Sequence, residues 1–136
     1  LLAEQIRVVY RDHPLPDLLV PVPLHSNKLR RRGYNQSLLV ARQLSHELGI
    51  GLNATLVQRT RNTRPQQGLG AVQRRLNLRG AFKVDPAITQ LHPAVQRIAL
   101  IDDVVTTMTT ANTLAKALRK HLPASTQLHL WALARA

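Results

Sequence analysis

Hydrophobic positions follow two different spacings along this chain. Apolar residues recur every three or four positions over residues 1–10, 35–48 and 109–121, which predicts helices. Short apolar runs predict strands over residues 17–23, 54–60, 97–104 and 126–133, with an extended piece at 80–84. Because strands alternate with helices, we expect an α/β fold with a mostly parallel sheet covered by helices on both faces.

Glycine and proline residues between these segments indicate where the elements end. Gly49 follows the second helical pattern where a left-handed residue is wanted, and Pro123 stops the third. Residues 61–70 are rich in Pro, Gly, Asn and Gln and predict a loop within the domain, with one or two helical turns after it. Parallel sheets bind ligands beyond the carboxyl ends of their strands, so we expect the functional site where residues 23–24 and 102–103 lie.

Length and composition restrict the class of protein. The chain has 136 residues, 44% of them hydrophobic, which suits a single domain spanning 1–136 with one core. No apolar run approaches the roughly 18 residues of a membrane span, and the first residues lack the basic-then-apolar pattern of a secretory leader, so we expect none. The absence of cysteine fits a reducing compartment, so we expect a cytoplasmic protein. The chain begins with Leu1 instead of Met, so we expect a fragment of a longer protein.

The charge is strongly positive. Lys and Arg number 19 against 7 acidic residues, which gives a net charge of +12, and most of the cations are arginine. Arginine binds phosphates with two parallel hydrogen bonds and stacks on bases. We therefore expect an anionic partner, either a phosphorylated substrate or nucleic acid.

The most informative group of polar side chains lies at the carboxyl end of the strongest predicted strand and directly after it. Two adjacent carboxylates, Asp102 and Asp103, are followed by hydroxyls and by the start of a helix. Carboxylates accept hydrogen bonds from the vicinal hydroxyls of a ribose, and a helix start favours a phosphate. This arrangement predicts ribose binding at the two acids and phosphate binding at the following residues, Thr106, Thr107, Met108, Thr109 and Thr110.

The same run resembles the phosphoribosyl pyrophosphate (PRPP) signature of type I phosphoribosyltransferases. That signature has four apolar residues, two acids, two apolar residues and then Thr-Thr-Gly-x-Thr, and residues 98–110 match it in order. The departure is Met108, which stands where the family has glycine. Glycine lets a backbone approach phosphate closely, so Met108 is where a catalytic and a binding-only interpretation separate.

Other segments resemble the ComF subfamily of these proteins, and together the motifs cover nearly the whole chain. Residues 21–25 read Pro-Val-Pro-Leu-His, residues 32–36 read Arg-Gly-Tyr-Asn-Gln, and residues 132–135 match the end of the family. Between them, the family spacing is matched by Gln66, Leu69, Arg74, Asn77 and the Gly-Ala-Phe at residues 80–82.

The resemblance implies a type I phosphoribosyltransferase fold with a small hood and a flexible loop. It implies PRPP with Mg²⁺, the metal held through the ligand and through Asp102 and Asp103, and a transferase (pentosyl) reaction in nucleoside metabolism. It also implies a link to competence and DNA uptake, with proteins of the competence machinery as partners. The pyrophosphate-loop candidates are Leu24, His25 and Arg32, and the flexible-loop candidates are Gln66, Arg74 and Asn77.

Two basic stretches carry interpretations of their own. Lys28, Arg30 and Arg31, next to Tyr34, are candidate nucleic-acid contacts, because phosphates attract the cations and a base can stack on the ring. A second stretch either closes over a pyrophosphate or extends a groove for single-stranded DNA: Arg59, Arg61, Arg64, Arg74, Arg75 and Arg79. The histidines have no metal-ligand spacing, so we expect no zinc site.

Two functions remain open at this level. The first is an enzyme that transfers a phosphoribosyl group from PRPP to an acceptor that the sequence does not identify. The second is a non-catalytic protein that keeps the fold, senses PRPP or a nucleotide, and binds single-stranded DNA through its basic face. The intact acids and threonines favour the enzyme, whereas Met108 and the net charge of +12 favour the binding protein.

Overall fold

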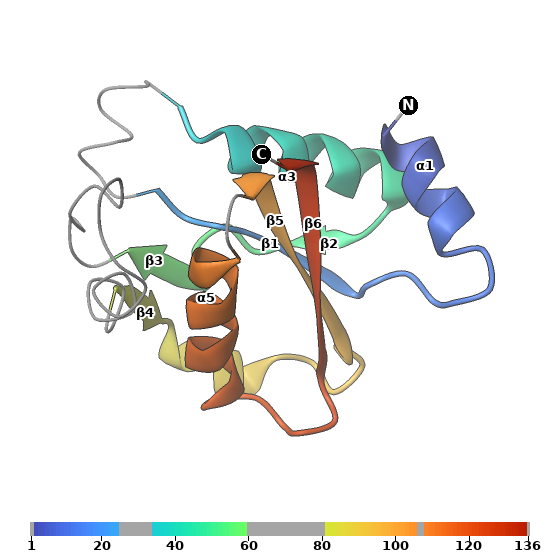
Figure 1. Cartoon of the computed structure of the whole chain (residues 1–136). Helices are drawn as coiled ribbons and strands as arrows, with labels where there is room; N and C mark the ends of the chain where they lie inside the picture. The colour runs from blue at the N-terminus through green and yellow to red at the C-terminus, as the bar shows by residue number, and fades with distance from the viewer. Residues whose placement is uncertain (1, 25–33, 60–80, 106–107, 136) are drawn as a thin grey trace.

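A parallel sheet of four strands forms the centre of the molecule (Figure 1). The computed structural model describes residues 2–24, 34–59, 81–105 and 108–135. The sheet order is β2-β1-β5-β6, and a separate antiparallel pair joins β3 to β4. The fold prediction is therefore confirmed as α/β with a mostly parallel sheet. The strands are β1 (Leu18–Pro21), β2 (Gly51–Leu52), β3 (Val57–Arg59), β4 (Phe82–Val84), β5 (Arg97–Val105) and β6 (Gln127–Arg135).

Helices cover both faces of this sheet. Helices α1 (Leu2–Val9) and α3 (Gln36–Leu48) pack on one face, and α5 (Thr109–Arg119) packs on the other with the short 3₁₀ helix η1 (Pro86–Gln90) (Figure 1). The β3–β4 pair lies on the α5 side, where Val57 joins the same buried cluster as Leu114. The chain thus forms three layers, with the sheet in the middle.

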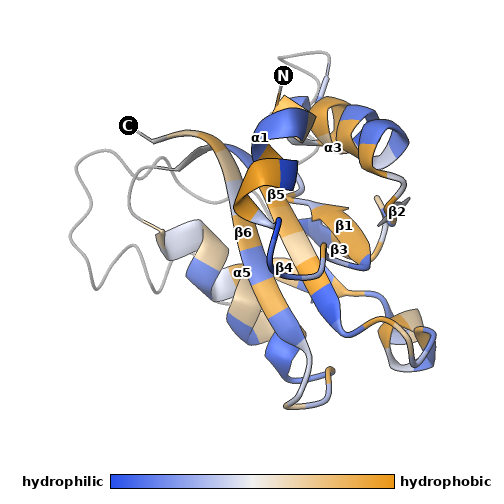
Figure 2. Cartoon of the chain, turned by 90° about the vertical axis from the view of Figure 1, so that its right-hand side faces the viewer, coloured by the Kyte–Doolittle hydropathy of each residue, from blue (hydrophilic) through white to orange (hydrophobic). Residues whose placement is uncertain are grey.

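Alternation along the strands assigns residues to the two cores. Leu19 and Ala99 face α1 and α3, whereas Val20 and Leu100 face α5. All four residues of β1 are buried, because a central parallel strand is covered on both sides. The hydropathy colouring follows this arrangement, with apolar residues concentrated on β1 and β5 (Figure 2). Among the described residues, no helix combines the length and the apolar character needed to cross a membrane.

Local signals explain the ends of α3. The side chain of Asn35 accepts a hydrogen bond from the Ser37 amide at 3.0 Å and caps the first turn. At the other end Gly49 adopts the left-handed conformation, with φ 68°, and its amide donates to the Ser45 carbonyl. The predicted glycine cap is confirmed.

Several short elements differ from those predicted from the sequence. The strand predicted over residues 54–60 is shorter, and β2 and η1 were not predicted. A two-residue strand has no periodicity to detect, and β2 exists because Gly51 and Leu52 pair with Leu18 and Leu19. The predicted loop at 61–70 and the helical turns at 71–78 lie outside the described residues.

Candidate functional site

The carboxyl end of β1 lies beside the carboxyl-terminal half of β5. Pro21 pairs with Ile101 in parallel register, and the Val22 amide donates to the Ile101 carbonyl at 2.8 Å. Pro23 therefore follows the end of β1, whereas Asp102 is the next residue of β5, which continues to Val105 paired with β6. The carboxyl edge is the position at which sheets of this kind bind ligands.

Asp102 is a half-buried carboxylate in this edge. Its Oδ1 accepts a hydrogen bond from the Asp103 amide at 2.9 Å. The pKa of Asp102 is raised to about 6, mainly by burial. The Asp103 side chain also raises this pKa, whereas the hydrogen bond from the Asp103 amide and the charge of Arg59 lower it. The carboxylate is therefore ionised above pH 6 in an environment that favours hydroxyl donors or a cation beside it.

Helix α5 begins shortly after these acids. Met108 is its N-cap residue and holds a left-handed backbone, with φ 66° and ψ 0°. The Met108 side chain offers no oxygen to the first turn, so this helix start has no side-chain cap. Thr109 and Thr110 form the first two helical positions and are partly buried. An anion at this position would meet backbone amides and a favourable helix dipole.

Arg59, at the end of β3, joins the site from a different sheet. Its guanidinium lies over the Phe82 ring at 5.1 Å from the centroid, because the two residues are register partners. Its Nε atom is buried, and no residue of the described part of the chain forms a hydrogen bond with it. Burial lowers the pKa of the Arg59 guanidinium, and the charge of Asp102 counteracts this shift. The sequence placed Arg59 in a basic stretch but carried no signal that distinguished it, because its burial depends on the β3–β4 pairing.

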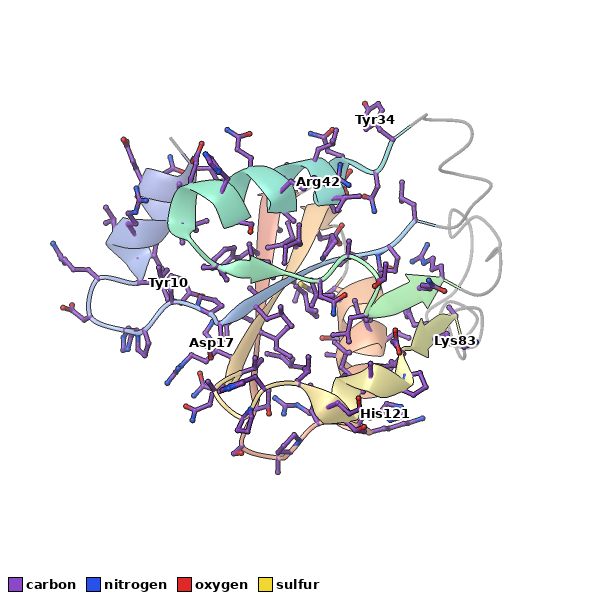
Figure 3. The ribbon with its side chains drawn as sticks, turned by 180° about the vertical axis from the view of Figure 1, so that it is seen from behind. Tyr10, Asp17, Tyr34, Arg42, Lys83 and His121 are labelled. Carbon is purple, nitrogen blue, oxygen red and sulfur yellow. The ribbon has the colours of Figure 1, made fainter. Side chains whose placement is uncertain are left out.

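A cavity of about 590 Å³ opens beside this arginine. It lies between the end of β1, the start of α3 and β3, and Figure 3 shows Tyr34 at the start of α3 with Arg42 farther along that helix. Two residues predicted from the sequence, Leu24 and Tyr34, line this one cavity, and Tyr34 is 49% exposed. The remaining walls include Pro21, Pro23, Leu38, Leu39, Val57 and Arg59.

Many predicted site residues lie outside the described residues. They are His25, Lys28, Arg30, Arg31, Arg32, Gln66, Arg74, Asn77, Thr106 and Thr107. Within the part that the structure describes, no group of three or more metal-ligating side chains occurs. The oxygen donors of Asp102 and Asp103 fit Mg²⁺, which takes few protein ligands and keeps waters or phosphate oxygens.

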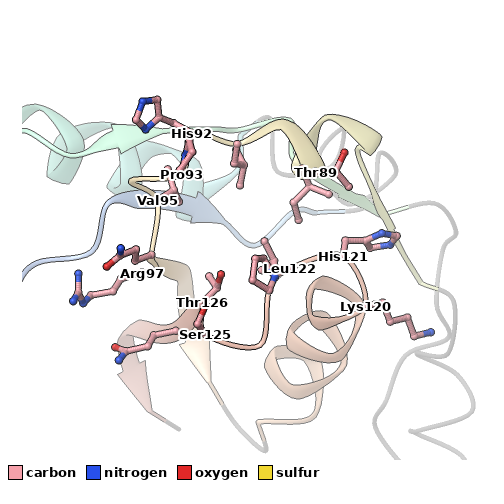
Figure 4. Close-up of a pocket in the computed structure, with 15 residues that line it drawn as sticks. Thr89, His92, Pro93, Val95, Arg97, Lys120, His121, Leu122, Ser125 and Thr126 are labelled. Atoms are coloured by element: carbon pink, nitrogen blue, oxygen red, sulfur yellow. The ribbon is translucent and has the colours of Figure 1, made fainter.

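A larger cavity of about 670 Å³ lies at the opposite, amino end of β5 and β6 (Figure 4). The basic side chains of this cavity do not point toward one common position, since Arg97 lies at one side of the close-up and Lys120 and His121 lie at the other. Arg97 also pairs with Asp17, at 3.9 Å. The geometry therefore favours the carboxyl-end edge as the functional site.

Comparisons with known proteins support the resemblance seen in the motifs. No protein-family model matches the chain. Competence protein F of Haemophilus influenzae is 41% identical over 138 residues, which cover 100% of this chain and 58% of that protein. A protein named DNA utilization protein YhgH, from Salmonella typhi, is 36% identical over 137 residues, which cover 99% of this chain and 57% of that protein. The chain spans somewhat more than half the length of these curated relatives.

A solved structure supports the fold. The purine phosphoribosyltransferase of Pyrococcus horikoshii matches with a TM-score of 0.52 over 99% of this chain and 78% of its own, at 17% sequence identity. At that identity the match shows the fold and carries no information on substrate. The expected phosphoribosyltransferase fold is confirmed.

Proposed function

Since this chain is similar over its whole length to Competence protein F and has a phosphoribosyltransferase fold, we propose that it belongs to the ComF family and binds a PRPP-type sugar phosphate at the carboxyl edge of its sheet. The observation that carries the proposal is the meeting of three features there: the half-buried Asp102, the start of α5 and the end of β1. The relatives' names link them to competence and DNA utilisation, and we propose the same cellular role for the protein that contains this segment.

Each part of the ligand has a matching group. Asp102 and Asp103 accept hydrogen bonds from the ribose hydroxyls, and the first amides of α5 bind the 5-phosphate. Mg²⁺, held by oxygens of the ligand and of the two aspartates, would neutralise charge on the pyrophosphate. Arg59 supplies a fixed positive charge near Asp102.

The reaction that this site suits is transfer of the phosphoribosyl group with departure of pyrophosphate. The chain's residues hold the sugar, exclude water and stabilise positive charge on the ribose through the Asp102 and Asp103 carboxylates. Such a transfer needs no nucleophile from the protein.

The test is calorimetry of PRPP with Mg²⁺. Replacing both acids, Asp102→Asn with Asp103→Asn, should weaken binding at least tenfold, because the double variant has neither the hydroxyl acceptors nor the metal ligands. Affinity of the wild type should also fall as the pH drops below about 6, since protonated Asp102 no longer accepts both hydroxyls.

The matched control is Asp12→Asn, which removes one carboxylate from an exposed position on the loop after α1. This variant should bind as the wild type does. Absence of PRPP binding by the wild type, or equal binding by the double variant, would overturn the proposal.

Single-stranded DNA binding is a second candidate function, favoured by the net charge of +12. Helix α5 carries exposed Lys116 and Arg119, Lys120 follows it, and no acidic residue lies in the helix. Here the sugar-phosphate site would sense a nucleotide while the basic surface holds the strand.

A further inference from the structure

Strand β6 forms one border of the parallel sheet, and its outer edge has no partner among the described strands. The sheet order places β5 on its inner side, and Figure 2 shows β6 at the side of the sheet next to β5. The opposite border strand, β2, has two residues, whereas β6 has nine. A long border strand presents a row of free backbone donors and acceptors to another strand.

This border lacks the residues that sheets use to discourage such pairing. Residues 127–134 read Gln-Leu-His-Leu-Trp-Ala-Leu-Ala, with no lysine, arginine, acid, proline or glycine. Proteins commonly protect an exposed border strand with charged residues or proline. The chain as a whole carries a net charge of +12, so two copies that meet at this edge bring no like charges together. An uncharged edge also offers no attraction to a polyanion.

The backbone hydrogen bonds of β6 determine which of its residues face outward. The Gln127 amide donates to the Gln96 carbonyl at 2.9 Å, so Gln127 directs its backbone groups toward β5. Because these groups alternate in direction along a strand, the next residue and every second one after it direct theirs to the free edge. These outward residues are Leu128, Leu130, Ala132 and Ala134.

The outward residues are complementary to those of a second copy of the same strand. Two β6 strands that pair antiparallel with Trp131 opposite Trp131 set Leu128 against Ala134. The same register sets Leu130 against Ala132, so every outward residue exchanges backbone hydrogen bonds and each leucine packs against an alanine. A register shifted by two residues instead sets Leu130 against Leu130, or Ala132 against Ala132. The strand therefore favours its own copy as partner.

The α1 side of the same border is apolar and partly uncovered. A groove of about 290 Å³ between α1 and β6 is lined by Val9, Trp131 and Leu133 among others. Val9 exposes 73% of its surface and Leu133 exposes 40%. In the register above, Leu133 of the second copy lies opposite His129, which stacks on Tyr10 directly after α1. Pairing thus brings the exposed Leu133 of one copy toward the exposed Val9 of the other.

We propose that the outer edge of β6 is a self-association surface, at which two copies of this chain pair their β6 strands antiparallel across a two-fold axis through Trp131. The two sheets then form one continuous sheet with four strands from each copy. Ala132 is the register partner of Asp102, so this interface lies one strand away from the proposed sugar-phosphate site. The proposal uses only β6 and α1 and does not depend on sugar-phosphate binding.

The test is the mass of the full 136-residue chain in solution, measured by sedimentation velocity over a range of protein concentrations. We expect a dimer whose association strengthens as salt rises from about 50 to 500 mM, because salt screens the repulsion between two positively charged copies. Association that weakens with salt, or a monomer under all these conditions, would overturn the proposal.

Two substitutions at Ala132 test the interface. Ala132→Lys places a charge against Leu130 of the second copy and should weaken the dimer by about tenfold or more, because a lysine buried without a partner is costly. Ala132→Pro removes an outward amide hydrogen but no hydrogen bond to β5, and should also produce a monomer. The matched control is Ala124→Lys, since Ala124 is exposed in the turn before β6 and outside the interface. Circular dichroism shows whether each variant is folded.

A spin label measures the register of the paired strands. The chain has no cysteine, so Gln127→Cys provides a single labelling position. In the proposed register this position lies opposite residue 135 of the second copy, which separates the two labels by about 27 Å at about 3.4 Å per residue. A parallel pairing would bring the labels to about 5 Å. A separation near 5 Å, or a dimer that neither Ala132→Lys nor Ala132→Pro weakens, would overturn this interface.

Discussion

Met108 holds a backbone conformation that ordinary side chains disfavour. Its φ is 66°, and among the described non-glycine residues Met108 alone has a positive φ. The PRPP signature that this run resembles has glycine at the same position. The side chain is 40% exposed. The chain thus keeps the turn that glycine would allow and accepts strain to do so.

Replacing Met108 with glycine should stabilise the protein. Because glycine adopts this conformation without a clash at Cβ, we expect Met108→Gly to raise the free energy of unfolding by about 1 kcal/mol. Urea unfolding measures the change, and PRPP affinity should rise along with it because the backbone can approach the phosphate. Met108→Ala keeps a Cβ and is the control; an equal gain in Met108→Ala would show that strain at Cβ is not the cause.

At the scale of elements, Asp17 joins the starts of β1 and β5. Its Oδ2 accepts hydrogen bonds from the amides of Gln96 at 2.8 Å and Arg97 at 3.0 Å. The Asp17 amide donates to the Arg97 carbonyl at 2.8 Å, and the charged groups of the two side chains lie 3.9 Å apart. This contact sets the register that brings Pro21 beside Ile101 at the far end of the strands.

Removing the Asp17 carboxylate should therefore destabilise the sheet. We expect Asp17→Ala to lower the free energy of unfolding by about 1–3 kcal/mol, because two backbone donors are left without their charged acceptor. Chemical denaturation monitored by circular dichroism measures the decrease. Asp12→Ala, at an exposed position, should change stability by less than about 0.5 kcal/mol; similar decreases in both variants would refute the specific role of Asp17.

Element boundaries show where sequence periodicity is sufficient. Residues 36–48 form a helix that ends at the predicted Gly49 cap. The prediction began this helix at Asn35, which instead caps its first turn. Strand β2 could not be predicted, because Gly51 and Leu52 become a strand only by pairing with β1. Local chemistry determines helix ends, whereas short strands depend on a partner.

At the scale of the whole molecule, the positive charge and the proposed site at the edge of the sheet lie at different ends of α5. The net charge of +12 favours a polyanion, and α5 presents Lys116 and Arg119, followed by Lys120, without a neighbouring acid in the helix. The proposed sugar-phosphate site lies at the start of α5 and these cations lie toward its end, so a DNA strand could bind without occupying that site.

We expect the protein to bind an oligothymidine strand with an affinity that falls steeply between about 50 and 200 mM salt, because binding to phosphates releases counterions. Neutralising Lys116, Arg119 and Lys120 together should reduce the slope of log K against log salt by about one for each phosphate that these cations bind. Fluorescence anisotropy measures both. Neutralising Arg7 and Arg11 on the α1 side is the control; a flat salt dependence, or equal effects of the two sets, would reject this surface.

The sequence by itself determined the types of the main elements, the parallel α/β class and the position of Asp102 and Asp103 in the carboxyl-terminal half of the strongest strand, because periodicity and caps are local properties. Only the tertiary structure decided that Arg59 lies over Phe82, that its buried Nε has no partner among the described residues, and that Tyr34 and Leu24 border one cavity. These facts depend on which strands pair and which segments pack, and residues distant in sequence carry no local signal of the neighbours they will meet.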